Sequence, residues 1–350
     1  MYFKEYKNRR VLITGHTGFK GSWLTMILKE LGSDILGYSL EPKFSPNLFT
    51  ICNVKEGIQN VFGDIRDEEH LNKVINDFKP EIIFHLAAQP LVRLSYKDPK
   101  TTYDVNVMGT LNVYEAARKS GSVQAIVAIT TDKCYENKEW VYGYRENDPM
   151  GGYDPYSSSK GCMELLSSSY RRSFLEEEGI LLATARAGNV IGGGDWAEDR
   201  LIPDFVRSVS SNKKLVIRNP LATRPWQHVL EPLSGYLELG AKLLEGNKEF
   251  ASGWNFGPND TDVLSVEDIL DESIKVWGKG EYELDKSAQP HEAMLLKLDI
   301  SKAKALLKWH PKYNVHKAVR NTINWYKAYY EGKNDIKKYT IDQIRRYFEY

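Results

Sequence analysis

Apolar and polar residues follow two different spacings along the first half of the chain. Apolar runs of five to eight residues predict buried strands at 10–14, 34–38, 81–86, 124–130 and 180–187. Between them, apolar residues at helical spacing predict helices at 22–31, 68–78, 101–119 and 157–178. Strands that alternate with helices are typical of a parallel sheet covered on both faces. We therefore expect an α/β fold with a Rossmann-type, doubly wound parallel sheet.

The pattern changes at Gly188, where a glycine-rich loop replaces the regular alternation. Beyond it we expect helices at 230–244, 263–277 and 300–307, a strand at 253–257 and a charged helix in the tail from 334 to 350. We assign residues 1–187 to a cofactor-binding domain, with 225–256 packing back onto it. Residues 188–224 and 257–350 are expected to form a smaller C-terminal α/β substrate domain.

Composition narrows the class of protein. The 350 residues contain 47 Lys and Arg and 47 Asp and Glu, so no net charge favours nucleic acid or an anionic membrane as partner. No apolar run reaches the roughly 20 residues of a membrane span, and the first ten residues lack a signal-peptide core. The three widely spaced cysteines suit reduced thiols rather than disulfides or a metal site. These features predict a cytoplasmic globular protein without a metal.

A glycine-rich turn follows the first predicted strand. Gly15, Gly18 and Gly21 are spaced three residues apart between that strand and a helix. Absent side chains allow the backbone to approach a pyrophosphate, and the helix start supplies N–H groups and a positive dipole end. An ordinary strand–helix turn is the alternative, but this arrangement near the N-terminus favours dinucleotide binding.

The second predicted strand bears on the choice between NAD and NADP. An acidic residue at its end normally bonds the adenosine ribose and favours NAD. Here the strand runs into Ser39 and Leu40, so the acid is displaced to Glu41 or missing, and Lys43 could tolerate a phosphate. Asp64 is positioned to accept from an adenine amine, although a surface turn would explain it equally well. We expect NAD.

The stretch after the predicted strand 124–130 carries the candidate chemistry. Tyr156 and Lys160 are four residues apart, which places them on one face of a helix. We expect the Lys160 ammonium to favour the phenolate and so to lower the pKa of Tyr156, making it a base for a sugar hydroxyl. Thr131 could hydrogen-bond the same hydroxyl. Asp132 and Lys133 follow directly and exceed what simple alcohol oxidation needs. Taken alone, Tyr-x-x-x-Lys is more often a surface helix start.

Together, the glycine turn and Tyr-x-x-x-Lys resemble the extended short-chain dehydrogenase/reductase superfamily. Three longer strings resemble the CDP-glucose 4,6-dehydratase family within it: TGHTGFKGSW at 14–23, TDKCYENKEWVYGYRENDPMGGY at 131–153 and RNPLATRPWQHVLEP at 218–232. The similarity weakens after about residue 312. It implies a homodimer that packs through the catalytic helix, CDP-glucose as substrate, and a role in deoxysugar and cell-surface polysaccharide synthesis.

The resemblance also implies a mechanism. Tyr156, with Lys160 and Thr131, deprotonates the C4 hydroxyl while hydride passes from C4 to tightly held NAD. The ketone acidifies the C5 proton, Asp132 protonates the departing C6 hydroxyl, and hydride returns to C6. Related dehydratases for other nucleotides carry Glu where this chain has Lys133, so we expect Lys133 to take the C5 proton. The alternative is a structural lysine paired with Asp132.

The site residues that we expect fall into two further groups. The cofactor-binding group, besides Tyr156 and Lys160, is Gly15, Thr17, Gly18, Phe19, Lys20, Gly21, Ser39, Asp64, Ile65, Leu86, Ala87, Ala88, Gln89 and Asn106. The substrate-binding group, rich in arginine for bidentate phosphate contacts, is Arg93, Asn189, Arg200, Leu201, Arg218, Arg224 and His291.

Two other functions stay open from the sequence. An epimerase or reductase of the same superfamily shares the fold, since fold alone does not fix reaction. The Asp132–Lys133 pair argues against an epimerase, which has no leaving hydroxyl to protonate. A catalytically silent NAD-binding module is disfavoured by the presence of Thr131, Tyr156 and Lys160.

Overall fold

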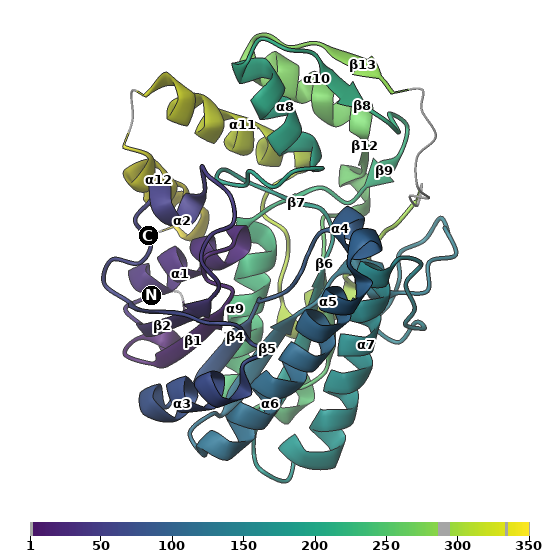
Figure 1. Ribbon diagram of the computed structural model, residues 1–350. Coiled ribbons are helices and arrows are strands. Elements are labelled where there is room, and N and C mark those ends of the chain that lie inside the picture. Colours follow the sequence, from purple (N-terminus) through teal and green to yellow (C-terminus); the bar gives the residue numbers. More distant parts are fainter. Residues whose placement is uncertain (1–2, 286–294, 333–334, 350) are drawn as a thin grey trace.

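A seven-stranded parallel sheet forms the centre of the molecule (Figure 1). The computed structural model describes residues 3–285, 295–332 and 335–349. The strand order is β11-β6-β5-β4-β1-β2-β3, and every pairing within this sheet is parallel. The strands are β1 (Arg10–Thr14), β2 (Asp34–Ser39), β3 (Gln59–Phe62), β4 (Ile82–His85), β5 (Ala125–Ile129), β6 (Leu181–Ala187) and β11 (Gly253–Phe256). The order reverses direction at β1, which confirms the doubly wound sheet.

Alternate residues of the central strands enter two separate cores. Val11 and Ile13 of β1 face one cluster of buried side chains, whereas Leu12 faces the other. The first cluster is covered by α1 (Phe19–Glu30) and α9 (Leu230–Leu244), and the second by α3 (Glu68–Phe78), α6 (Gly109–Ser120) and α7 (Pro155–Tyr170). Because both faces are covered, the strands are apolar throughout, as the sequence pattern indicated.

The helix predicted at 101–119 is interrupted. It comprises α5 (Pro99–Tyr103), a π-helical turn at Asp104–Met108, and α6. Such π turns are frequent at functional sites, and this one carries the buried Asn106. Two short helices, α2 (Leu48–Ile51) and α4 (Val92–Lys97), complete this part of the chain.

Beyond residue 188 the chain builds the upper part of Figure 1. Its elements are β7 (Val190–Ile191), α8 (Leu201–Ser210), β8 (Leu215–Ile217), β9 (Thr223–Arg224), β10 (Gln227–His228), β12 (Leu264–Ser265), α10 (Val266–Trp277), β13 (Tyr282–Leu284), α11 (Val315–Glu331) and α12 (Ile336–Phe348). The chain returns to the central sheet with α9 and β11, and β11 pairs with β6. Within the described residues, no helix combines the length and the apolar content that crossing a bilayer requires.

Helix α11 was absent from the sequence prediction. Its buried side chains recur at helical spacing, from Val315 through Val319, Ile323 and Tyr326, so the signal was present in the sequence. The segment predicted as a helix at 300–307 forms a π-helical turn at Ala303–Leu307.

Candidate active site

The catalytic candidates meet at the carboxyl end of β5. Thr131 and Asp132 follow the strand directly, and Oγ1 of Thr131 donates to Oδ1 of Asp132 at 3.0 Å. Tyr156 lies at the start of α7, which begins with Asp154 accepting from the Ser157 backbone N–H. The Thr131 hydroxyl also hydrogen-bonds the Tyr156 phenol. This is the edge at which doubly wound sheets bind ligands.

The protonation of the tyrosine–lysine pair differs from the expectation. Burial raises the pKa of Tyr156 to about 12, although the hydrogen bond from Thr131 opposes the shift. The Lys160 amine donates instead to the Ile129 carbonyl at 3.1 Å. Burial, reinforced by the nearby charge of Lys20, lowers the pKa of Lys160 to about 7. The expectation that Lys160 lowers the phenol's pKa is therefore wrong for this structure, because burial has the largest effect on that pKa and raises it.

Asp132 is a buried carboxyl with one oxygen that forms no hydrogen bond to the described residues. Its carboxyl is buried, and Oδ2 is a buried atom without a hydrogen-bond partner. Burial raises its pKa, while the charge of Lys133, the hydrogen bond with Thr131 and the charge of Arg224 oppose the shift. A raised pKa favours the neutral carboxyl, which is the form that can donate a proton. Asp132 thus has the property of a general acid.

Lys133 is partly buried, and its backbone N–H donates a hydrogen bond to the Thr131 hydroxyl at 3.3 Å. No side-chain hydrogen bond of Lys133 is among those of the described residues.

Two glycines of the turn are required by the protein backbone itself. Gly15 has φ +76°, and a Cβ there would lie 2.7 Å from the Ala87 nitrogen. A Cβ on Gly21 would lie 2.1 Å from the Gly15 carbonyl oxygen. Gly18 is different, because a Cβ there would approach only that same oxygen, at 3.3 Å. Gly18 caps α1, and no side chain bonds the first turn of this helix, which also lacks acidic residues. This open, positive helix start fits a diphosphate.

The loop after β4 forms a wall against the glycine turn. The backbone N–H groups of Leu86 and Ala87 bond to the carbonyl and the hydroxyl of Thr14, at 3.1 and 3.3 Å, and the chain continues through Ala88. Asn106 accepts from the N–H of Gln89 at 2.8 Å and donates to its carbonyl at 3.1 Å.

Asn106 also ties this wall to the catalytic helix. Its amide donates to Oγ of Ser159 at 2.9 Å, one residue before Lys160. Asn106 is fully buried, so it is a positioning residue between two parts of the site. The alternative of a solvated side chain is excluded.

The adenosine side of the site has no acid at the end of its strand. The Thr17 and Ser39 hydroxyls bond at 2.8 Å, and Glu41 is exposed. Asp64 is held by Arg66, whose Nη2 donates at 2.6 Å, and these hydrogen bonds are the chief cause that lowers the Asp64 pKa. The buried Ile65 packs against Gly109, and Phe19 packs at the edge of the core at the α1 start.

Two of the predicted substrate arginines share one carboxylate, and a third pairs with another. Asp199 pairs with Arg93 at 3.5 Å and with Arg218 at 3.2 Å. Arg200 pairs with Asp195 at 2.7 Å, and the charge of Arg200 acts on the Tyr156 phenol. The arginines from three separate segments therefore face one region.

The other predicted substrate-binding residues make different kinds of contact from one another. Arg224 is buried and acts electrostatically on Asp132. The Asn189 carbonyl accepts from the Gln227 N–H at 3.0 Å, and Leu201 begins α8. His291 lies outside the described residues.

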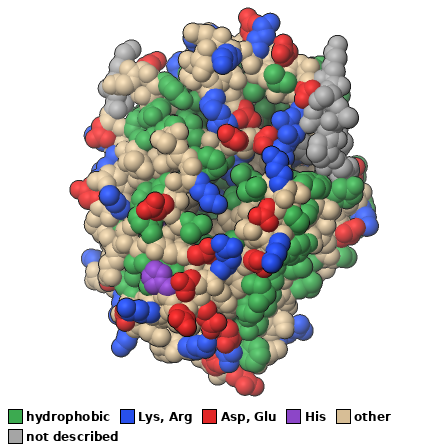
Figure 2. All heavy atoms as spheres, in the orientation of Figure 1, with side chains coloured by type: hydrophobic (Ala, Val, Ile, Leu, Met, Phe, Trp, Pro, Cys, Tyr) green, Lys and Arg blue, Asp and Glu red, His purple; other side chains and the backbone are tan. Residues whose placement is uncertain are grey.

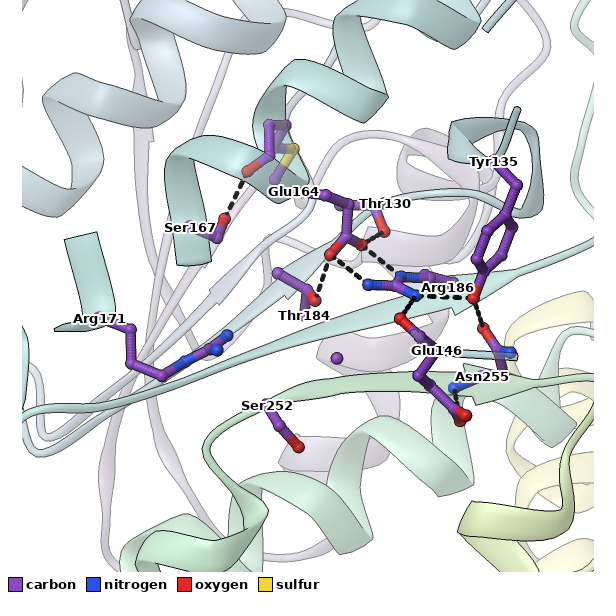
Figure 3. Close-up of polar contacts among 12 residues, drawn as sticks. Thr130, Tyr135, Glu146, Glu164, Ser167, Arg171, Thr184, Arg186, Ser252 and Asn255 are labelled. Atoms are coloured by element: carbon purple, nitrogen blue, oxygen red, sulfur yellow. Dashed lines mark hydrogen bonds and ion pairs between the residues drawn. The ribbon is translucent and has the colours of Figure 1, made fainter. Parts of the chain in front are cut away.

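A buried polar network beneath the site was missed by sequence reasoning (Figure 3). Glu164 of α7 forms an ion pair with Arg186 of β6 at 2.8 Å and accepts from Thr130 and Thr184 at 2.5 and 2.7 Å. Arg186 also donates to the Tyr135 phenol at 2.6 Å. These contacts join the end of β5, strand β6, helix α7 and the loop after Asp132 to one another. The sequence feature that could have predicted the network is the presence of two charged residues, Glu164 and Arg186, within apolar segments.

The doubly wound sheet, the glycine turn and the Thr, Tyr and Lys at the end of β5 define a short-chain dehydrogenase/reductase. The chain belongs to the GDP-mannose 4,6 dehydratase family, whose model matches residues 12–322.

Curated relatives cover nearly the whole chain. A CDP-glucose 4,6-dehydratase of Salmonella typhimurium is 52% identical over 335 residues, covering 94% of this chain and 93% of the relative. A human dTDP-D-glucose 4,6-dehydratase is 27% identical over 347 residues, covering 94% and 93%. The first of these relatives confirms the resemblance that was inferred from the three sequence strings.

Solved structures share the fold. An epimerase of Methanothermobacter thermautotrophicus has a TM-score of 0.80 at 23% identity and covers 96% of each chain. The dTDP-glucose 4,6-dehydratase DesIV of Streptomyces venezuelae, solved with NAD and TYD bound, has a TM-score of 0.80 at 20% identity, covering 93% of this chain and 99% of DesIV.

Proposed function

We propose that this chain is an NAD-dependent CDP-glucose 4,6-dehydratase, a hydro-lyase that converts CDP-glucose to CDP-4-dehydro-6-deoxyglucose and water. The 52% identity to a CDP-glucose 4,6-dehydratase supports the nucleotide sugar. The reaction type is carried by one observation: the buried, partnerless Oδ2 of Asp132 beside Thr131 and Tyr156. A dehydratase needs a proton donor at this place, and oxidation of an alcohol alone does not.

The described residues fit NAD. Its diphosphate suits the open start of α1 beside Gly18, and its nicotinamide end suits the wall of Leu86–Gln89 next to Lys160. When bound, NAD supplies the chemistry of accepting a hydride from C4 and returning it to C6. Glu41 is exposed beyond the end of β2, so the choice of NAD over NADP is supported by relatives solved with NAD bound.

The side chains of the site divide the proton transfers among them. Tyr156, as the phenolate, takes the proton of the C4 hydroxyl, with Thr131 bonding the same oxygen. Lys133 takes the C5 proton when its amine is neutral. Asp132 gives its proton to the C6 oxygen, and water leaves. The proton taken by Lys133 then returns to C5 as hydride is delivered to C6. Acid and base groups of this kind each contribute about 10²–10⁴ in rate.

The substrate diphosphate is proposed to lie on the arginine side of the site. Arg93, Arg200, Arg218 and Arg224 supply positive charge there, and guanidinium groups bind phosphate in bidentate fashion. Asn189 and Leu201 border the same region, and His291 keeps its predicted role as a proposal.

The proposal includes a homodimer. Hydrophobic side chains gather on the face over α6 and α7 (Figure 2). Met108, at the end of the π turn before α6, and Leu165 of α7 are 50% and 62% exposed. An exposed apolar patch beside the catalytic helix suits a twofold interface. The free Cys52, Cys134 and Cys162 agree with the cytoplasm as the proposed location.

Incubation of the purified protein with CDP-glucose and no added cofactor tests the function. A 4-keto sugar without net reduced cofactor is expected, because the hydride is returned in each cycle and the cofactor is held tightly. Formation of CDP-galactose would favour the epimerase. Unchanged sugar despite bound NAD would favour the silent module.

A further inference from the structure

A fully buried histidine lies behind the wall that we assign to the nicotinamide. His85 is the last residue of β4, directly before Leu86, and its side chain is buried completely. Its Nδ1 lies 2.7 Å from the Thr14 hydroxyl, and its Nε2 lies 2.9 Å from the Thr110 hydroxyl. Thr14 ends β1, and Thr110 belongs to α6. The imidazole therefore joins the strand before the glycine turn to the helix after the π turn.

The Thr110 hydroxyl fixes the state of Nε2. This hydroxyl donates its single hydrogen to the Asn106 carbonyl at 2.7 Å, so toward the ring it can only accept. Nε2 of His85 must therefore carry a hydrogen and donate it to Thr110.

The other ring nitrogen is an acceptor. Burial, reinforced by the charge of Lys160, lowers the pKa of His85 to about 3, so the ring is neutral at pH 7 and Nδ1 carries no hydrogen. The Thr14 hydroxyl donates to Nδ1, while its oxygen accepts from the Ala87 N–H at 3.3 Å. Both hydroxyls thus point their hydrogens in the same sense along the chain of bonds.

These contacts form one continuous chain of hydrogen bonds with a single direction. It runs from the Ala87 N–H to the Asn106 carbonyl, and the imidazole of His85 stands at its centre. The Asn106 side chain in turn bonds both backbone groups of Gln89. One network therefore holds the wall at Ala87 and at Gln89, and His85 connects the two ends.

We propose that His85 is a positioning residue for the nicotinamide end of the cofactor, and that it acts through its Nε2–H tautomer. The inference rests on the proposed function, because it requires the nicotinamide at the wall of Leu86–Gln89. In the other tautomer the Thr110 hydroxyl would have to donate to Nε2 and release the Asn106 carbonyl. The chain of bonds would then break at the π turn.

Nitrogen NMR of protein with isotope-labelled histidine determines the tautomer without any turnover. The ring of His85, assigned by its change in Thr110→Val, should carry a hydrogen on Nε2 and none on Nδ1 between pH 5 and pH 8. A hydrogen on Nδ1, or a titration of this ring within that range, would overturn the inference.

Thr110→Val also tests the effect on the cofactor, because it removes one hydroxyl of the chain and keeps the shape of the side chain. Calorimetry on the full-length protein should show an affinity for NAD that is about tenfold weaker, the equivalent of one lost hydrogen bond. Hydride transfer from C4 should slow by about 10- to 100-fold, because the ring is displaced from its reacting position. The KM for CDP-glucose should not change.

Thr322→Val is the matched control. The Thr322 hydroxyl is also buried and also donates to the carbonyl four residues earlier, that of Ala318 in α11, but it has no contact with the imidazole. Its NAD affinity and hydride step should match those of the wild type. Equal losses in the two variants would overturn the inference, since they would indicate a general loss of stability. A wild-type chain that binds NAD but leaves CDP-glucose unchanged would contradict the proposed function alone, because the tautomer and the NAD affinity are measured without the sugar.

Discussion

The Thr130 hydroxyl donates a hydrogen bond of 2.5 Å to Oε1 of Glu164, which joins the end of β5 to the catalytic helix α7. Arg186 of β6 completes the link through its ion pair with the same carboxylate. The reactive loop begins one residue later, at Thr131. The rigidity of the catalytic geometry therefore depends on a carboxylate that has no part in the chemistry.

Glu164→Ala should strongly destabilise the protein. It leaves the Arg186 guanidinium buried and unpaired, and removing one member of a buried pair costs about 3–5 kcal/mol. Urea denaturation measures the loss. Glu178→Ala, which breaks the partly exposed pair with Arg118, should cost no more than about 1 kcal/mol. Equal losses in the two variants would contradict the structural role of the network.

Asp132→Asn should separate oxidation at C4 from loss of water. Asparagine keeps the shape and the bond with Thr131 but cannot give a proton to the C6 oxygen. We expect turnover to fall by about 10²–10⁴, with reduced cofactor accumulating after addition of CDP-glucose. Absorbance and product chromatography measure both. Turnover within a few-fold of wild type would show that another group is the acid.

Lys133→Met tests the base at C5. If the Lys133 amine takes the C5 proton, solvent deuterium should enter C5 far more slowly in this variant, as measured by mass spectrometry of the product. Lys138→Met provides a control in the same loop, because Lys138 is exposed and pairs with Glu136. Undiminished exchange in Lys133→Met would leave Lys133 with only a structural role beside Asp132.

The sequence predicted more of the fold than of the electrostatics. Periodicity identified α9 at its observed bounds and all but one of the strands of the main sheet, because burial on both faces leaves a long apolar signal. It did not reveal the π turn that carries Asn106, whose side chain bonds Ser159 of another helix. The direction of the Tyr156 shift was also missed, because desolvation depends on what surrounds the phenol. Lys20 was assigned to the cofactor from its place in the turn, whereas the 3.5 Å hydrogen bond from its amine to the Tyr236 hydroxyl depends on the packing of α9 against α1.

Glu231 should make stability depend on pH. It is fully buried in α9 and accepts from the Lys312 and Tyr313 N–H groups and from the Tyr347 hydroxyl. Burial raises its pKa to about 7, against those hydrogen bonds. A raised carboxyl pKa means that the folded state holds the proton more tightly than the unfolded state.

The contribution of Glu231 is therefore present below the unfolded pKa near 4.5 and is lost as pH rises to about 7. Melting temperatures between pH 5 and pH 7.5 should fall more for the wild-type chain than for Glu231→Gln, which cannot ionise. Parallel pH profiles of the two proteins would show that Glu231 does not titrate in this range.

The central claim is that Tyr156 and Asp132 act on one sugar in one cavity, so that oxidation and loss of water are coupled. The most direct measurement uses CDP-glucose deuterated at C4 and locates the label in the product by NMR. The account predicts that the deuterium leaves C4 and appears at C6 of the same sugar. Deuterium released to solvent, or retained at C4 in a product that keeps its C6 hydroxyl, would contradict it.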